Sequence, residues 1–266
     1  MTASIVTYHT DPAELSNAIN ALLLNGVERL WIVDNSSSEE IRSLVGSWKE
    51  AVVYVASENR GYGAGHNQAL RRALDLGADY HLVMNSDIDF GAGTLSPMLG
   101  YLDRNPDVGM VQPRIVGLDG ELQYTVRRLP APIDLIGRRF FPRWMLGKRA
   151  DRYELRHIDH TRPFNVPYHQ GSFMLIRCAV LHQTGLFDER FFMYPEDIDL
   201  TRRVHARFRT MYLPSPTVVH AHRRESYASG RMLAIHCLNM IRYFNKWGWV
   251  FDRQRREFNG RIEKMG

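Results

Sequence analysis

The chain has 266 residues, enough for one large α/β domain or two fused halves, and its 44% hydrophobic and 24% charged residues are ordinary for a globular protein. No uninterrupted apolar run approaches the ~18 residues needed to cross a bilayer. No basic region precedes the first apolar segment, as one does in a signal peptide, and the net charge of +5 is moderate.

The basic charge is concentrated in two zones, one from Arg127 to Arg149 and the other from Arg242 to Arg261. Such zones can contact nucleic acid, anionic lipid or a phosphorylated substrate, and charge alone does not choose among them. No helix-turn-helix, RNA-binding or zinc signature accompanies them, so we expect no nucleic-acid partner. Cys178 and Cys237 lack metal-ligand spacing and are expected to be reduced structural thiols, as suits a cytosolic protein.

The first third of the chain alternates short apolar segments with helical patterns. The clearest helix is expected over residues 12–24, where Asp11 suits an N-cap and Pro12 the first helical position. Strands that alternate with helices pair in parallel, so this order predicts a Rossmann-like sheet. Strands are expected at 4–8, 30–33, 52–55 and 82–84, and further helices at 38–48 and around 69–76.

Two acidic residues, Asp87 and Asp89, follow the fourth of these strands. They are one residue apart, so in an extended or turned segment their side chains point the same way. Converging carboxylates at the carboxyl end of a parallel strand can hold Mg²⁺ or Mn²⁺. The alternative is that both are turn residues that hydrogen-bond local backbone.

Three alternate glycines, Gly61, Gly63 and Gly65, lie in the segment Asn59–Asn67 ahead of the third helix. Glycine lets backbone N–H groups approach a phosphate closely. The G-x-G-x-G spacing, and its place after the third strand, differ from the dinucleotide fingerprint and favour a nucleotide-sugar site over a nicotinamide site. A flexible loop without a ligand is the alternative.

The middle of the chain departs from the α/β rhythm. Residues 111–130 are expected to form a strand pair around the turn 117–120, where Asp119-Gly120 is a hairpin signal. Residues 130–167 contain repeated prolines, and a long segment of this kind is either functional or mobile, or is a solvated loop. Strand character returns at 171–176.

Pro195, Glu196 and Asp197 open a helix that is expected to run to about Arg207. The helix dipole favours carboxylates in a first turn, which by itself can explain them. The aromatic residues of 187–194 provide partly apolar surroundings that could instead tune a carboxylate as a general base.

The last strand is expected at 218–222, with His220 and His222 on one face and Arg223-Arg224 after them. Strand histidines are often structural, but two at this spacing beside arginines suit a metal and a pyrophosphate better. From Tyr227 onward we expect one long helix whose aromatic and basic residues suit a membrane interface. A helix packed on the core with a snorkelling basic face is the alternative.

Together these segments resemble the inverting nucleotide-sugar glycosyltransferases of family 2, which have the GT-A fold, and among them the bacterial rhamnosyltransferases that build O-antigen or other surface polysaccharide. The resemblance covers roughly residues 3–225, and residues 124–130 also look like a rhamnosyltransferase segment. The motifs that carry it are Ile5–Tyr8, Val33–Ser36, Asn59–Asn67, Asn85–Asp89, Gly171–Met174, Phe192–Leu200 and His220.

The resemblance implies a role for each matched residue. Thr7 and Asp34 would contact the nucleotide base. Asp89 would be the main metal ligand, with Asp87 against ribose or metal and His220 completing the site. The Glu196-Asp197 pair would supply the general base, which we assign to Asp197. The other residues expected to bind substrate are Tyr8, Asn35, Gly61, Gly63, Gly65, Asn67, Arg127 and Arg224, and His222 is a further candidate metal ligand.

The implied fold is an α/β GT-A fold, a Rossmann-like mixed sheet flanked by helices, with a C-terminal helical extension. Residues 1–110 would bind the nucleotide sugar, 111–225 would form the acceptor-binding and catalytic half, and 226–266 a basic aromatic helix. The expected reaction moves L-rhamnose from dTDP-rhamnose to a lipid-linked saccharide with Mg²⁺ or Mn²⁺. Such a protein would be cytoplasmic and peripheral, on the anionic inner face of the plasma membrane.

Three other functions stay open. A UDP- or GDP-sugar could be the donor, because no single side chain here identifies rhamnose. A GT-A-like nucleotidyltransferase carries a glycine-rich, Lys- or Arg-bearing signature after its first strand, which residues 7–11 do not match. A non-enzymatic binding protein is least expected, because Asp89, Asp197 and His220 are retained together.

Overall fold

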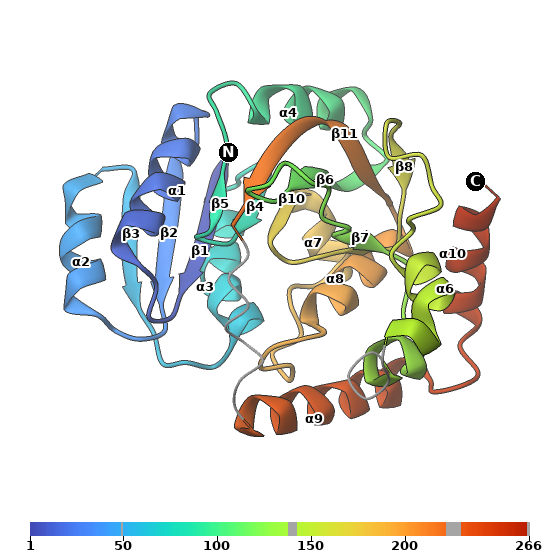
Figure 1. Cartoon of the computed structure of the whole chain (residues 1–266). Coiled ribbons are helices and arrows are strands. Elements are labelled where there is room, and N and C mark those ends of the chain that lie inside the picture. The colour runs from blue at the N-terminus through green and yellow to red at the C-terminus, as the bar shows by residue number, and fades with distance from the viewer. Residues whose placement is uncertain (49, 138–142, 222–229, 265–266) are drawn as a thin grey trace.

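The computed structural model describes residues 1–48, 50–137, 143–221 and 230–264. A mixed β-sheet forms its centre, with helices on both faces and two C-terminal helices beyond it (Figure 1). The main-sheet strands are β1 (Thr2–Thr7), β2 (Arg29–Asp34), β3 (Val52–Ala56), β4 (Tyr80–Met84), β5 (Ile88–Asp89), β6 (Val108–Val116), β8 (Phe164–Asn165), β10 (Phe173–Arg177) and β11 (Arg209–His220). They lie in the order β3-β2-β1-β4-β10-β6-β11-β5, with β8 beside β11.

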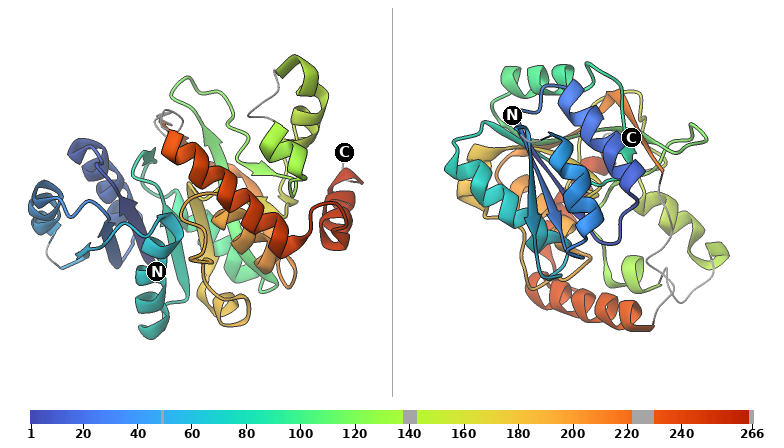
Figure 2. Two further views of the ribbon diagram at one scale, coloured as in Figure 1. Left: turned by 90° about the horizontal axis from the view of Figure 1, so that it is seen from below. Right: turned by 90° about the vertical axis from the view of Figure 1, so that its left-hand side faces the viewer.

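The helices cover the sheet as two layers, seen edge-on in Figure 2. Buried side chains of α1, α2 and α4 pack on one face, and those of α3, α7 and α8 on the other. The helices are α1 (Pro12–Leu24), α2 (Glu39–Val45), a 3₁₀ turn η1 (Gly46–Trp48), α3 (Tyr62–Asp75), α4 (Leu95–Arg104), a π-helical turn η2 (Ile133–Gly137), α6 (Arg143–Tyr153), α7 (Cys178–Thr184), α8 (Glu196–His205), α9 (Gly230–Trp247) and α10 (Arg253–Glu263).

The N-terminal half has the predicted parallel arrangement. Strand β1 pairs in parallel with β2 and β4, and β2 with β3. Asp11 caps α1, since its carboxylate accepts hydrogen bonds from Ala13 N at 2.8 Å and Glu14 N at 3.2 Å. This arrangement brings the carboxyl ends of β1, β2 and β4 to one edge.

The sheet becomes mixed in its second half. Strand β10 runs antiparallel between β4 and β6, and β11 runs parallel to β6. The expected hairpin at 111–130 is reduced to one bridge between Val116 and Leu122. Strand β7 (Val126–Arg127) pairs instead with β9 (Tyr168–His169), because Val126 is buried in a cluster with Leu155 and Val166.

The C-terminal segment was expected to be one helix but forms two, α9 and α10. Gly248 ends the first in a left-handed conformation (φ +102°) that favours glycine. Asp252 then caps α10 by accepting a hydrogen bond from Arg255 N at 2.9 Å. None of the helices in the described ranges has the length and apolarity that a membrane span requires.

Candidate active site

The carboxylates of Glu196 and Asp197 lie buried in the first turn of α8. Asp197 Oδ2 accepts hydrogen bonds from Gly171 N at 3.0 Å and the Tyr168 hydroxyl at 3.3 Å, and Oδ1 accepts one from Ile198 N at 2.8 Å. Burial raises the pKa of Asp197, and the hydrogen bonds limit the rise. A carboxylate with a raised pKa suits general-base work near neutral pH.

Glu196 lies beside this group and is only 4% exposed. Burial, and then the charge of Asp197, raise the pKa of Glu196 well above its ordinary value. Within the described chain, Glu196 Oε2 has no hydrogen-bond partner. Two adjacent buried acids disfavour each other's ionisation, so we assign the charge to Asp197, which receives donors from Gly171 and Tyr168.

Arg127 supplies positive charge next to Asp197. Its guanidinium lies over the rings of Tyr153 and Tyr168, 5.9 and 5.8 Å from their centroids. Burial alone would lower the pKa of Arg127, but the two tyrosines and nearby acids outweigh it, and the pKa is raised. The side chain therefore stays cationic, and its contact with substrate stays a prediction.

Asp87 and His220 come together at the far end of the sheet. Asp87 Oδ2 lies 3.2 Å from His220 Nε2, and the two side chains are 16% and 1% exposed. On the other side of the ring, His220 Nδ1 lies 2.8 Å from Gln123 Oε1, and Gln123 Nε2 donates to His220 O at 2.9 Å. Gln123 thus fixes the ring's orientation, as partners of metal-binding histidines do.

Asp89 is placed apart from this pair. It is exposed and pairs with Val219 in β5, whereas Ile88 pairs with His220. Directly opposed residues of an antiparallel pair share a face, so Asp89 and His220 lie on opposite faces. Among the residues that the structure describes, no group of three His, Cys, Asp or Glu side chains is arranged to hold a metal ion. His222 and Arg224, two further predicted site residues, lie outside the described residues.

Tyr62 joins the two groups of acids, although the sequence did not single it out. Its hydroxyl donates to Gly171 O at 2.6 Å and lies 3.0 Å from Asn85 Oδ1. Burial, and then the surrounding carboxylates of Glu196, Asp197 and Asp87, raise the pKa of Tyr62 well above its ordinary value. The ring thus lies between the base and the Asp87–His220 pair.

Thr7 and Asp34 meet at the ends of β1 and β2, where Thr7 Oγ1 donates to Asp34 Oδ1 at 3.1 Å. Asp34 also accepts from Ser36 N at 3.0 Å, Ser38 N at 2.6 Å and the Tyr54 hydroxyl at 2.9 Å. Burial alone would raise the pKa of Asp34, but these hydrogen bonds outweigh it and the pKa is lowered. The ionised Asp34 therefore orders the loop after β2.

Two neighbouring predicted residues present groups to this edge of the sheet. Tyr8 is 57% exposed directly after β1. Asn35 Nδ2 contacts Asn59 Oδ1 at 3.4 Å, while Asn35 Oδ1 has no partner among the described residues. A ligand at this edge can therefore use both side chains.

The three glycines pack closely at the start of α3, which begins at Tyr62, earlier than the sequence suggested. Any side chain on them would collide with a neighbour, so they let α3 approach both β1 and the segment 187–192. A Cβ at Gly61, Gly63 and Gly65 would lie 1.9 Å from Phe192 O, 2.9 Å from Phe187 Cβ and 2.7 Å from Val6 Cγ2, respectively.

Asn67 reinforces the same packing. Its Nδ2 donates to Phe187 O at 2.9 Å and Glu189 Oε1 at 3.0 Å, and its Oδ1 accepts from Phe187 N at 3.0 Å. These contacts explain why the glycines and Asn67 occur together. Their role in substrate binding stays a prediction.

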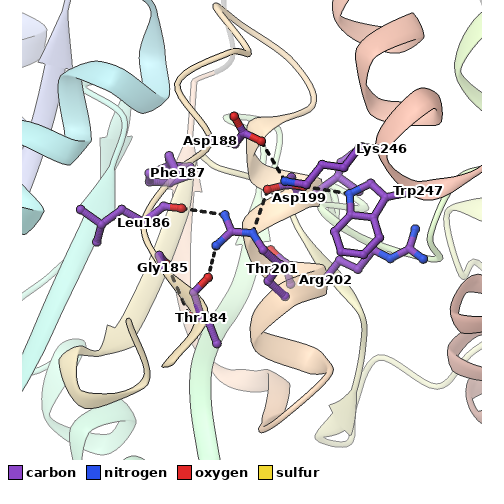
Figure 3. Close-up of polar contacts among 12 residues, drawn as sticks. Thr184, Gly185, Leu186, Phe187, Asp188, Asp199, Thr201, Arg202, Lys246 and Trp247 are labelled. Atoms are coloured by element: carbon purple, nitrogen blue, oxygen red, sulfur yellow. Dashed lines mark hydrogen bonds and ion pairs between the residues drawn. The ribbon is translucent and has the colours of Figure 1, made fainter. Parts of the chain in front are cut away.

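Helix α8 is fixed by Asp199, which is fully buried. Asp199 accepts hydrogen bonds from Trp247 Nε1 at 2.8 Å and pairs with Lys246 Nζ at 2.6 Å (Figure 3). Lys246 Nζ also lies 2.8 Å from Asp188 Oδ2, and Arg203 Nε donates to Asp199 at 2.9 Å. The helix that presents Asp197 is thereby joined to α9.

Arg202 makes the matching connection to α10. Its guanidinium donates to both carboxylate oxygens of Asp252, at 2.6 and 2.8 Å, with both side chains almost fully buried. It also lies 4.0 Å from the centroid of a Trp247 ring. The C-terminal helices therefore hold α8 in position from outside the sheet.

Three residues that complete the site were missed by sequence reasoning. Tyr62 lies inside the glycine segment, where its position between glycines was a usable signal. Tyr168 and Gln123 carry no local signal, because the β7–β9 pair and the Val116–Leu122 bridge bring them to the site from outside the motifs.

Comparison with known proteins identifies related chains. The family model described as Glycosyl transferase family 2 matches residues 3–185. N-acetylglucosaminyl-diphospho-decaprenol L-rhamnosyltransferase of Mycobacterium tuberculosis is 29% identical over 222 residues, covering 77% of this chain and 69% of that protein. Rhamnosyltransferase WbbL of Escherichia coli K12 is 27% identical over 194 residues, covering 68% of this chain and 70% of that protein.

The fold has solved counterparts as well. The structure of GalNAc-T7 with UDP, GalNAc and Mn²⁺ superposes with a TM-score of 0.65 at 13% identity. The match covers 100% of this chain and 51% of that one, so the chain spans about half of its length. At this identity the likeness shows the fold alone.

Proposed function

The chain belongs to glycosyl transferase family 2, and on that basis we propose that it is an inverting glycosyltransferase that moves L-rhamnose from dTDP-rhamnose to a lipid-linked saccharide. The family and the GT-A fold expected from the sequence are confirmed. The rhamnosyl donor and the lipid-linked acceptor are supported by the names of two relatives. Residues 1–110 are assigned to donor binding, 111–225 to acceptor binding and catalysis, and 226–266 to membrane contact.

The observation that carries this proposal is the buried Asp197, oriented by Gly171 N and the Tyr168 hydroxyl and flanked by Arg127. Asp197 takes the proton from the acceptor hydroxyl as that oxygen attacks the anomeric carbon. The bond from that carbon to the diphosphate oxygen breaks, and the electron pair leaves with the diphosphate. A single displacement inverts the anomeric configuration. Arg127 favours the ionised form of Asp197 before the reaction.

A divalent cation fits the donor set at the sheet edge. Asp87 offers carboxylate oxygen and His220 an imidazole nitrogen, a combination that Mn²⁺ accepts more readily than Mg²⁺. These two residues would hold the ion. Asp89 lies on the opposite strand face from His220, and His222 lies outside the described residues, so their part in metal binding stays a sequence-based prediction. When bound, the ion neutralises charge on the leaving diphosphate. The GalNAc-T7 structure contains Mn²⁺.

A lipid-linked acceptor would require the protein to contact a membrane. The segment that joins α9 to α10 has the side chains for such a contact. Trp249, Val250 and Phe251 are 39%, 71% and 87% exposed there. Arg253 and Arg256 follow at the start of α10. Exposed apolar side chains beside basic ones are typical of peripheral binding to anionic lipid. These side chains support the proposal of a peripheral protein, which we assign to the cytoplasmic face of the plasma membrane as expected from the sequence.

The proposal is tested with a panel of nucleotide sugars, with and without Mn²⁺ or Mg²⁺, scored by thermal shift and release of nucleoside diphosphate. Selective stabilisation and slow hydrolysis of dTDP-rhamnose are expected. A response to a UDP- or GDP-sugar alone would retain the transferase and reject rhamnose. Folded protein that responds to no donor would overturn the enzymatic proposal.

A further inference from the structure

A pocket of about 560 Å³ lies between η2, α6 and α10, and the candidate site residues Asp87, Glu196 and Asp197 are not part of its lining. Its lining has a strong excess of positive charge, because six cationic side chains face two acidic ones, Asp134 and Glu263. The cationic residues are Arg128, Lys148, Arg149, Arg152, Arg255 and Arg256.

The two acids neutralise only part of this charge. Glu263 pairs with Arg152 and with Arg128, the latter at 2.6 Å. Asp134 Oδ1 lies 2.6 Å from Arg149 Nε. Among the described residues, Lys148 and Arg256 have no carboxylate partner, and the Arg255 guanidinium donates to backbone carbonyls, which carry no net charge.

Arg128 has a donor left over inside this pocket. Its side chain is 19% exposed, and its Nε is buried without a hydrogen-bond partner in the described part of the chain. Burial lowers the pKa of Arg128, and the neighbouring Arg152 and Arg149 lower it further, against the pull of Glu263. A ligand anion would satisfy this donor and reduce the repulsion among the arginines.

The pocket adjoins the proposed catalytic centre. Arg127 and Arg128 are consecutive, so their side chains leave the β7 segment on opposite sides. Arg127 reaches the rings of Tyr153 and Tyr168, and Tyr168 donates to Asp197. Tyr153 also lines the pocket. Tyr153 thus lies between the pocket and Arg127, the arginine next to Asp197.

We propose that this pocket binds the phosphate or diphosphate group of the acceptor. This inference rests on the proposed function, because it requires a lipid-linked acceptor that carries such a group. Guanidinium groups match phosphate oxygens with paired hydrogen bonds, and a diphosphate offers enough oxygens and charge to engage several of these cations at once. The pocket's position lets it hold the anionic end of an acceptor whose sugar lies at Asp197. The pocket would select acceptors by the phosphate or diphosphate that joins sugar to lipid, and not by the sugar itself.

The test uses the full chain with Lys148→Gln/Arg256→Gln. Neither side chain pairs with a carboxylate in the part of the chain that the structure describes, so the fold should tolerate their loss. Binding of inorganic pyrophosphate is measured by calorimetry, with the donor site saturated by the nucleoside diphosphate that the donor panel identifies. We expect affinity to fall about tenfold or more. The matched control, Arg72→Gln/Arg162→Gln, removes the same charge from exposed positions outside the pocket and should change affinity little.

Kinetics separate the possible sources of the phosphate. With a short, soluble diphosphate-linked acceptor, the variant should raise KM at least tenfold with a much smaller effect on kcat. Unchanged pyrophosphate affinity and KM would overturn the proposal. Loss of binding to phosphatidylglycerol vesicles without either of those changes would also overturn it, because the pocket would then serve lipid headgroups. If no donor is accepted at all, the proposed function fails, and the pyrophosphate measurement is made without a nucleotide. It then still tests the pocket, because affinity should fall in Lys148→Gln/Arg256→Gln and not in Arg72→Gln/Arg162→Gln.

Discussion

Asp197 has more hydrogen-bond donors than a carboxylate that only starts a helix. Two of its three donors, Gly171 N and the Tyr168 hydroxyl, come from other elements. A residue that served only the helix dipole would need neither. This arrangement fixes one carboxylate orientation and favours its ionised form, as a general base requires.

Replacing Asp197 with Asn keeps the shape and removes the proton acceptor. We expect turnover to fall by about 10²–10⁴, while calorimetry shows donor affinity close to wild type. Turnover equal to wild type would remove Asp197 from the mechanism, and lost donor affinity would show a structural role instead.

Glu196 predicts a pH-dependent stability. Its pKa is raised on folding, so the folded protein holds a proton that the unfolded chain releases. Stability should therefore fall as pH rises above the ordinary value of 4.5 through the raised pKa. In Glu196→Gln this fall should be clearly smaller in thermal denaturation between acidic and neutral pH, and the raised pKa of Asp197 accounts for the part that remains. Glu121→Gln, at an exposed position, serves as the control, and a wild-type curve no steeper than that of Glu196→Gln would contradict the assignment.

At the scale of elements, α8 combines two tasks along one helix. Glu196 and Asp197 in its first turn form the candidate base, whereas Asp199 in the same turn pairs with Lys246 of α9 and Arg202 in the next turn pairs with Asp252 at the start of α10. The sequence indicated the acidic residues of this helix but not which of them face the candidate site and which pair with other helices. Spacing alone cannot distinguish a carboxylate that faces substrate from one that faces a lysine on a distant helix.

The Arg202–Asp252 pair should be worth much more than an exposed one. Asp252→Asn leaves a buried guanidinium without its counter-charge and should lower the free energy of unfolding by about 3–5 kcal/mol. The control is Asp107→Asn, whose exposed pair with Arg209 is screened by solvent and should contribute little to stability. Urea denaturation measures both, and equal small effects would show that the buried pair does not hold the C-terminal helices.

Gly61 provides a test of close packing. Gly61→Ala combines a positive φ of 100° with a clash against Phe192 O. Gly26→Ala has a similar backbone strain (φ +78°) with nothing within 4 Å of the new Cβ. We expect Gly26→Ala to cost about 1–2 kcal/mol and Gly61→Ala clearly more, by thermal denaturation. Equal losses of stability in the two variants would mean that the backbone at Phe192 moves away from the new Cβ at little cost.

At the scale of the whole molecule, the parallel half was predictable and the mixed half was not. Residues 4–84 alternate strand and helix patterns, and local connections of this kind dictate the pairing. Strands β6, β10 and β11 pair across the long segment 117–167, and no local pattern records which partner they choose. The C-terminal break did leave signals, Gly248 and the capping Asp252, but the continuing aromatic and basic pattern masked them.

The candidate site follows the same division. Asp87, Asp197 and His220 were found from motifs, and the structure brings Asp87 to His220 and buries Asp197. The expected convergence of Asp89 depended on strand alternation, which the turn at Ser86 and Asp87 interrupts. Partners such as Gln123 depend on tertiary contacts that only the folded chain specifies.

The corner between α9 and α10 can be tested as the membrane contact. Val250→Asp/Phe251→Asp should lower the affinity for anionic liposomes about tenfold or more, since each apolar side chain contributes about 1.5–3 kcal/mol when buried. Leu118→Asp alters an equally apolar residue, 80% exposed on a turn between β6 and β7, and should leave flotation unchanged. Equal flotation of all three proteins would reject the corner as the anchor.

The rigid link from α8 to the C-terminal helices has one more consequence. If the α9–α10 corner rests on the bilayer, the ion pairs of Arg202 with Asp252 and of Asp199 with Lys246 would hold the proposed base, Asp197, at a constant height above the lipid surface. The distance from the membrane to Asp197 would then be fixed. On the proposed lipid-linked acceptor, only a sugar hydroxyl at that height would reach Asp197, so the number of sugars below it would determine whether the acceptor is used.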